Sequence, residues 1–181
     1  ATNLDTLINE NDVLMAMPRT SNANILVIPI LFPDYNSCPN MKSNLEKAFF
    51  GSIIENGYYS LSEYYSLSSF GKLNITGDVV EPFTVSKNSS YYQYHENGDG
   101  LILEEALNYY VQHLDLSDYD GNSDGVIDGI YLIYNHPTDS SNDNFWWAYV
   151  TNNQNHYKKY DNMYANYYCF AGYEFIEESL S

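Results

Sequence analysis

Asp118-Tyr-Asp-Gly-Asn-Ser-Asp-Gly-Val-Ile-Asp-Gly-Ile-Tyr-Leu-Ile-Tyr134 joins an acidic loop directly to an apolar run. Short side chains that carry oxygen recur at every second position, and a glycine then allows the chain to bend, which is the pattern of a calcium-binding loop. The predicted ligands are Asp120, Asn122, Asp124, the carbonyl of Val126 and Asp128, with Asp118 as a further candidate. The apolar run that follows predicts a buried strand over 129–135.

The last position of this loop departs from an EF-hand. An EF-hand has a bidentate glutamate there, and this chain has Tyr131. The loop is therefore EF-like and leads straight into a strand. The alternative is a turn rich in Asx and Gly residues whose acids are simply solvated. The spacing of several ligands around Gly125 favours calcium.

The composition predicts one domain, or one domain with an extension, because the chain has 181 residues. A formal net charge of −17, with only 7 Lys and Arg residues, makes nucleic acid and anionic membranes poor partners. No apolar run is long enough to span a bilayer. The absence of a signal peptide at Ala1 favours a mature or trimmed chain. Cys38 and Cys169 form no CxxC pair, and the sequence leaves open whether they form a disulfide or remain thiols.

The order of elements predicts an α/β (α+β) fold in which a mixed sheet packs against about three helices. The run 25–32 is apolar and β-branched, and Pro29 in it argues for an edge position or a bulge. The expected helices are 40–54, a helix capped by Ser60 and Glu63 that stops near Phe70–Gly71, and 103–114. Further strands are expected over 72–77, 79–85, 145–150 and 163–173, with polar loops over 86–100 and 137–144.

A complete catalytic set is missing from the sequence. His95-Glu-Asn-Gly-Asp99 begins like the zinc motif His-Glu-x-x-His, but Asp99 replaces the second histidine and Asn-Gly breaks the helix. His113 is expected near a helix C-terminus in a capping role, and His136 is expected to be structural. There is no Gly-x-Ser-x-Gly elbow and no phosphate-binding glycine loop.

Three segments, in order, resemble the immune inhibitor A–like family of secreted bacterial zinc metallopeptidases. They are Asn24-Ile-Leu-Val-Ile-Pro-Ile-Leu-Phe-Pro-Asp34, Ser60-Leu-Ser-Glu-Tyr-Tyr-Ser-Leu-Ser-Ser-Phe-Gly-Lys-Leu-Asn-Ile-Thr-Gly-Asp78 and 118–134. The resemblance covers about 24–176 and implies a zincin-like N-terminal subdomain with a twisted mixed sheet. It divides the chain into an arm, 1–23, and this subdomain, 24–181.

The resemblance also implies roles for particular residues. It supports calcium at the acidic loop, and it makes Phe145, Trp146, Trp147 and Ala148 part of an edge strand along the substrate cleft, where a peptide can pair as an added strand. The packing alternative is that at least one of the two tryptophans lies in the core. The family's zinc helix is expected beyond Ser181, so no residue of this chain is assigned to zinc or to catalysis.

Two functions remain as hypotheses. In the first, the chain is part of a secreted zinc metalloendopeptidase, supplies a calcium-stabilised sheet and one wall of the substrate cleft, and is inactive alone. In the second, it is a stand-alone calcium-dependent binding module with a degenerate peptidase fold. Both predict an extracellular or cell-surface protein. A sheet face without its zinc helix is expected to be covered by the N-terminal arm, by a second copy or by swapping.

Overall fold

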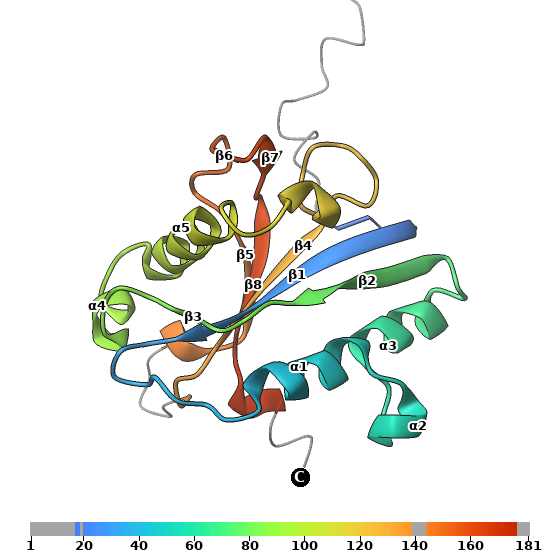
Figure 1. Cartoon of the computed structure of the whole chain (residues 1–181), viewed down its shortest axis with the longest axis horizontal. Helices are drawn as coiled ribbons and strands as arrows, with labels where there is room; N and C mark the ends of the chain where they lie inside the picture. The colour runs from blue at the N-terminus through green and yellow to red at the C-terminus, as the bar shows by residue number, and fades with distance from the viewer. Residues whose placement is uncertain (1–16, 19, 139–143, 177–181) are drawn as a thin grey trace, which may run out of the picture.

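The computed structural model of the chain describes residues 17–18, 20–138 and 144–176, and its sheet is mixed, as the sequence predicts (Figure 1). The strands are β1 (Ser21–Leu31), β2 (Leu73–Val79), β3 (Phe83–Thr84), β4 (Gly129–Tyr134), β5 (Tyr149–Asn152), β6 (Lys159–Tyr160), β7 (Met163–Tyr164) and β8 (Tyr167–Gly172). The helices are α1 (Met41–Phe50), α2 (Ile53–Asn56), α3 (Leu61–Ser68), α4 (Ser89–Gln93) and α5 (Gly98–Tyr110), with the 3₁₀ turns η2 (Leu116–Tyr119) and η3 (Asn144–Trp146).

The main sheet has the order β2-β1-β4-β8-β5, and β3 pairs with β1 beyond the end of β2. The pairs β1–β2, β1–β4 and β4–β8 are parallel, whereas β5 is antiparallel to β8 and ends the sheet. β6 and β7 form a separate two-stranded ribbon. An antiparallel edge strand on a parallel sheet is a common feature of mixed α/β folds.

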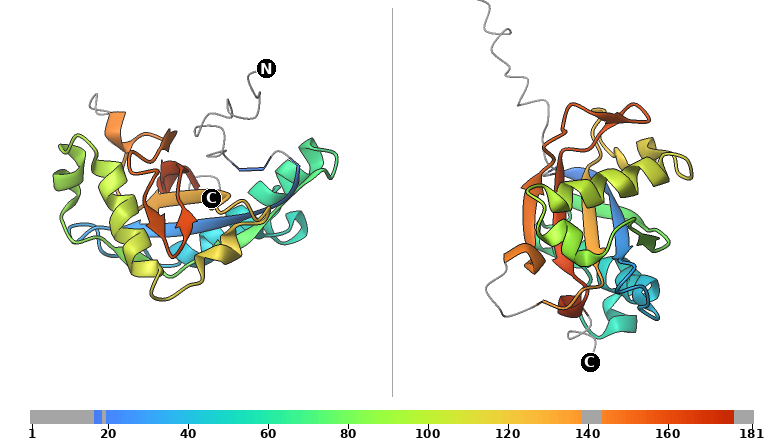
Figure 2. Two further views of the ribbon diagram at one scale, coloured as in Figure 1. Left: turned by 90° about the horizontal axis from the view of Figure 1, so that it is seen from above. Right: turned by 90° about the vertical axis from the view of Figure 1, so that its left-hand side faces the viewer.

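Two apolar layers cover the two faces of the sheet because the strand side chains alternate. Leu26 and Ile28 of β1 face the layer that contains α4, α5 and η2. Ile25 and Val27 face α1, with α3 at its margin. Figure 1 shows α4 and α5 on one side of the long strands and α1 to α3 on the other, and in the right-hand view of Figure 2 α4 and α5 lie in front of the strands.

The structure confirms the three main helices but changes their bounds. Gly51 ends α1, so the predicted helix 40–54 is two helices. Ser60 caps α3 by accepting a hydrogen bond from the Glu63 backbone N–H, and Phe70 and Gly71 follow with positive φ. The predicted loop 86–100 is wrong, since α4 and the first turn of α5 lie within it.

Pro29 lies in the central strand β1, so the predicted edge position is wrong. On the β2 side, Val80 donates to the carbonyl of Val27, and the next paired residue of the neighbouring chain is Phe83, opposite Ile30. A residue's N–H and C=O point to the same side of a strand, and that side alternates. Pro29 therefore faces the interruption between β2 and β3, where a missing N–H costs no ladder hydrogen bond.

The boundary predicted at residue 23 also shifts. Ser21–Ala23, assigned to the arm, pair with Leu73–Ile75 as the first residues of β1. Residues 1–16 of that arm lie outside the described residues. Cys38 and Cys169 do not form a disulfide. Among the described helices, none has both the length and the apolar character needed to cross a membrane.

Candidate functional site

The acidic loop lies between η2 and β4, where the sequence predicts it. Its side chains fold back on the loop's own backbone, as Asx turns do. The N–H of Asp124 is 3.0 Å from Oδ1 of both Asp120 and Asn122, so these two oxygens converge on one point. The Gly125 N–H donates to Asp120 Oδ2 at 2.8 Å, and Gly125 has a φ of 84° that favours glycine. The loop thus brings three of the predicted ligands together.

A bridge to β7 orients the middle of the loop. Tyr164 donates its N–H to the Gly125 carbonyl and accepts from the Ile127 N–H, both at 2.9 Å. The backbone groups of Val126 alternate to the opposite side of this bridge, and the Val126 N–H donates to Asp124 Oδ1 at 2.9 Å. The role of the Val126 carbonyl as a backbone ligand stays a prediction.

Asp128 is buried, with 6% of its surface exposed, and its Oδ2 accepts from the backbone N–H groups of Asn24 and Gly121. Burial raises the pKa of Asp128 above its ordinary value, and the charges of Asp120 and Asp124 act in the same direction, although the two N–H groups oppose it. This oxygen thus serves the fold. As a calcium ligand, Asp128 would therefore have a second role besides these two structural hydrogen bonds.

Asp118 has an exposed side chain, while its backbone carbonyl accepts from Asn24 Nδ2 at 3.0 Å. Across the described residues, no three His, Cys, Asp or Glu side chains already converge as a metal-binding group. A calcium ion at the loop would therefore depend on Asn122 and on the Val126 carbonyl as well as on carboxylates. Their chemistry fits, because calcium prefers hard oxygen ligands of these kinds. The described ion pairs, Lys42–Glu81 and Lys158–Glu104, leave the acidic loop without a fixed positive partner.

The predicted edge strand 145–150 begins later than expected. Phe145 and Trp146 form the turn η3, and β5 starts at Tyr149. Trp146 is 1% exposed and lies 5.4 Å from Phe32 between ring centroids, which confirms that one tryptophan is core. The burial of its large indole explains why the chain turns before the strand starts.

The other predicted cleft residues lie outside the core. Trp147 is 60% exposed and meets Phe175 edge-on, with ring centroids 5.6 Å apart, and Ala148 is exposed. In β5 itself Val150 is 71% exposed. No further strand pairs with β5 among the described residues, so its outer edge ends the sheet.

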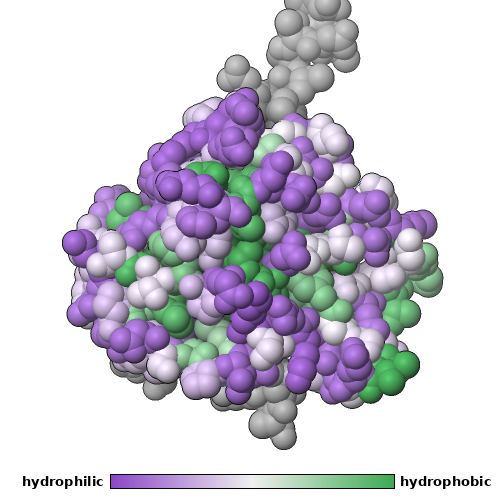
Figure 3. All heavy atoms as spheres, in the orientation of Figure 1, coloured by the Kyte–Doolittle hydropathy of each residue, from purple (hydrophilic) through white to green (hydrophobic). Residues whose placement is uncertain are grey.

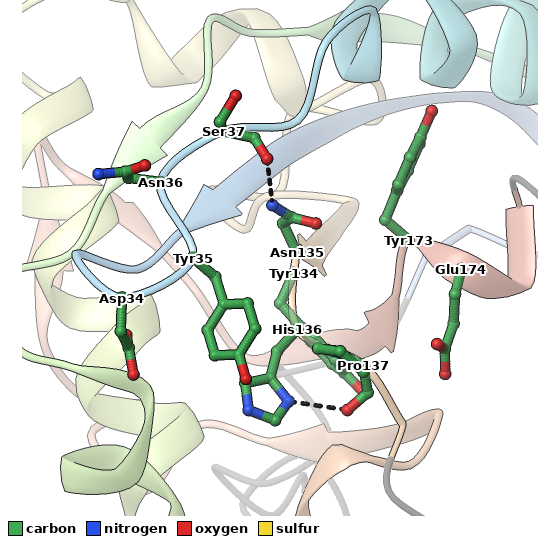
Figure 4. A pocket seen from close by; sticks show the side chains of 10 residues that line it. All are labelled: Asp34, Tyr35, Asn36, Ser37, Tyr134, Asn135, His136, Pro137, Tyr173 and Glu174. Carbon is green, nitrogen blue, oxygen red and sulfur yellow. Dashed lines mark hydrogen bonds between the residues drawn. The ribbon is translucent and has the colours of Figure 1, made fainter.

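A pocket of about 430 Å³ lies where β1, β4 and β8 end (Figure 4). Sequence analysis missed it as a site. Its lining includes Asp34, His136 and Glu174, and each of these follows one of the three strands. Ligands of open α/β sheets bind beyond the carboxyl ends of parallel strands, so this recurrence of polar residues at strand ends is the signal that was available.

No family model matches the chain, and no curated protein matches it. The resemblance to secreted zinc metallopeptidases therefore stays a prediction, supported only by its motifs and by the order of its elements.

Proposed function

We propose that this chain is the calcium-stabilised, substrate-aligning part of a secreted zinc metalloendopeptidase. The observation that carries the proposal is β5, an antiparallel edge strand at the end of an otherwise parallel sheet, in the region where the resemblance expects the edge of a substrate cleft. An extended peptide can pair with the outer backbone groups of such a strand, and alternate side chains then face the protein.

Calcium bound at the acidic loop would stabilise the β5 edge through a series of backbone hydrogen bonds. Tyr164, which brackets the loop with its two hydrogen bonds, is followed within three residues by β8, the partner of β5. Asn153, just after β5, donates its N–H to the Asn166 carbonyl at 2.6 Å and its side-chain amide to the Ala165 carbonyl at 2.9 Å. Calcium at the loop would thus stabilise the segment that positions the edge strand.

Zinc is not assigned to any described residue. The described His, Cys, Asp and Glu residues offer no group of three that could hold it, and His95 lies in the bend between α4 and α5, outside both helices. In this proposal zinc belongs to a longer parent protein, and the chain alone would bind peptides without cleaving them.

Calcium binding is tested by thermal unfolding of the 181-residue chain with EDTA and with calcium. A ligand at 100 times its Kd adds about 2.7 kcal/mol, which corresponds to a Tm increase on the order of 5–10 °C for a chain of this size. An equal Tm in EDTA and in calcium would remove the calcium part of the proposal. Magnesium serves as the matched ion, because its stricter octahedral geometry suits this loop less well.

Peptide binding is tested by hydrogen exchange of residues 149–152 with an extended peptide of alanine and serine residues. Pairing with β5 should slow exchange in this strand, and the same peptide with alternate backbone nitrogens methylated should not. Casein with added zinc should remain intact. Zinc-dependent cleavage by this chain, or unchanged exchange in β5 with both peptides, would contradict the proposal.

The stand-alone binding module is the other outcome of the same experiments. It shares the calcium response, but its partner would be recognised by exposed side chains and not by the backbone of β5. Figure 3 shows a largely hydrophilic face, with an apolar patch at the lower right, where Figure 1 places α2. Ile54 of α2, which is 93% exposed, is one of the exposed side chains that such a partner would contact.

A further inference from the structure

The pocket at the ends of β1, β4 and β8 is built from three connected segments. Asn135 Nδ2 donates to the Ser37 carbonyl at 3.0 Å, which joins the end of β4 to the loop after β1. Thr138 donates its N–H to Glu174 Oε1 at 2.7 Å, which joins the same segment to the end of β8. The walls are thus held by hydrogen bonds, as in a preformed ligand site.

The pocket carries negative charge that is not neutralised by a lysine or arginine in its lining. Figure 4 shows Asp34 and Glu174 toward opposite ends of the pocket, with Tyr35, His136 and Pro137 between them. Asp34 accepts from the Ser89 N–H at 2.9 Å and from the Ser89 hydroxyl at 2.7 Å. Partial burial opposes ionisation of Asp34, but these hydrogen bonds and the nearby His136 lower its pKa, so its carboxylate is charged at neutral pH.

Aromatic rings supply the rest of the surface. Tyr35 lies edge-on to His136, with ring centroids 4.5 Å apart, and His136 stacks on Trp146 at 3.9 Å. Tyr173 is also in the lining, but its ring is 3% exposed and packs in the layer on the α1 side of the sheet, where its hydroxyl accepts from Asn44 Nδ2 at 2.7 Å. Aromatic faces beside carboxylates attract organic cations, because the negative ring face and the acid act together.

Ring contacts link the pocket to the predicted cleft edge, although no residue of 145–150 is part of its lining. Trp146, which backs His136, and Trp147, which contacts Phe175 next to Glu174, immediately precede β5. A peptide paired along β5 would therefore reach the pocket with a side chain near the start of that strand.

We propose that this pocket binds the basic side chain, arginine or lysine, of a peptide that pairs with β5. Glu174 and Asp34 supply the negative charge, and the Tyr35 and His136 rings lie beside the aliphatic stem. The identity of the peptide as substrate rests on the proposed function, whereas the binding of a cation by the pocket does not.

The test uses N-acetyl-arginine methylamide and its neutral isostere N-acetyl-citrulline methylamide, titrated into the full chain by NMR. The arginine probe should bind at least tenfold more tightly than the citrulline probe. Glu174→Gln and Asp34→Asn should each weaken arginine binding at least fivefold, whereas Glu96→Gln, at an exposed acid outside the lining, should not. A cooperative unfolding transition in each variant establishes that the fold is intact, because Asp34→Asn removes one of the two oxygens that accept from Ser89 and should lower the Tm.

Equal binding of the two probes, or full arginine binding by the Glu174→Gln variant, would overturn the inference. Failure of the pocket and failure of the proposed function give different results. If the alanine and serine peptide protects β5 but the arginine probe does not bind, the pocket is wrong and the edge strand stands. If the arginine probe binds but no peptide protects β5, the pocket stands as a cation site and the edge strand is wrong.

Discussion

The carboxylate of Asp128 accepts a hydrogen bond from the backbone N–H of Asn24, 104 residues earlier in the chain, at 2.7 Å. The same oxygen accepts from the Gly121 N–H at 2.8 Å. One buried side chain thus fixes the acidic loop to the central strand β1. The sequence pattern marks Asp128 as a metal ligand, but these contacts give it a structural role that needs no metal.

Asp128→Ala should destabilise the calcium-free chain. The substitution leaves the N–H groups of Asn24 and Gly121 without their acceptor, and an unsatisfied buried donor costs about 1–3 kcal/mol. Urea unfolding in EDTA measures the effect. Asp118→Ala, at an exposed carboxylate of the same segment, is the control and should change the free energy of unfolding by less than about 0.5 kcal/mol. Equal effects of the two substitutions would mean that the Asp128 contacts carry no stability.

Asp120→Asn and Asp124→Asn should separate calcium binding from folding. Each removes a charge and one of the two oxygens that accept hydrogen bonds within the loop, so the free energy of unfolding in EDTA should fall by about 1 kcal/mol while the variant stays folded. Calcium affinity should fall at least tenfold, because charged oxygens dominate such sites. Calorimetric titration with calcium gives the affinities. Wild-type affinity in both variants would show that these carboxylates are not ligands.

Much of the fold follows from sequence periodicity, and the failures have physical causes. The apolar run of β1 and the spacing of Met41, Leu45 and Phe49 are strong signals because burial selects them directly. The start of α5 was missed because Gly98 and Gly100 favour loops. The structure needs Gly98 for space, since a Cβ there would lie 1.9 Å from the Tyr92 carbonyl oxygen.

The candidate site was predictable only where its ligands are local. The acidic loop is contiguous, so spacing alone brings Asp120 and Asp124 together. The pocket takes Asp34 and Glu174 from strand ends 140 residues apart, and only the sheet order makes them neighbours. The turn at Trp146 was missed because a run of aromatic residues favours a strand whether or not one ring turns into the core.

Tyr131→Glu should not convert the loop into a stronger calcium site. Position 131 would supply the bidentate glutamate of an EF-hand. Here Tyr131 belongs to β4, and its ring lies edge-on to Phe49, with centroids 5.1 Å apart. A carboxylate there would face the core, so the variant should lose several kcal/mol of stability or fail to fold. Tyr131→Phe is the control and should retain both folding and calcium affinity. A folded glutamate variant with tighter calcium binding would contradict this placement.

Alkaline pH should destabilise the protein through its buried tyrosines. Burial raises the pKa of Tyr92 and Tyr160 to about 12, and burial with the charge of Asp99 raises that of Tyr168 further. Unfolded tyrosine has a pKa of about 10. The folded state therefore binds more protons above pH 10, and its stability is full below that pH and is lost as pH rises toward the folded pKa values. Each such tyrosine contributes a slope of up to about 1.4 kcal/mol per pH unit.

Urea midpoints between pH 8 and 11 measure this loss. Tyr168→Phe should flatten the decline above pH 10, at the cost of the hydrogen bond that Tyr168 donates to Asp99 at 2.8 Å. Tyr91→Phe, at a ring that is 48% exposed, should leave the decline unchanged. A midpoint that is flat from pH 8 to 11 in the wild type would contradict the prediction.

Gly77→Ala should be much more damaging than Gly57→Ala, although both glycines have positive φ. Gly57 ends α2 with open space around it, so alanine there costs only the roughly 1–2 kcal/mol of a left-handed backbone. At Gly77, with a φ of 148°, a Cβ would lie 1.9 Å from the carbonyl oxygen of Ile25, its partner in β1. Relief requires β2 to move away from β1 and break their ladder, so we expect a cost above about 3 kcal/mol. Urea unfolding of the two variants measures the loss in free energy of unfolding. Equal losses would show that β2 does not approach β1 this closely.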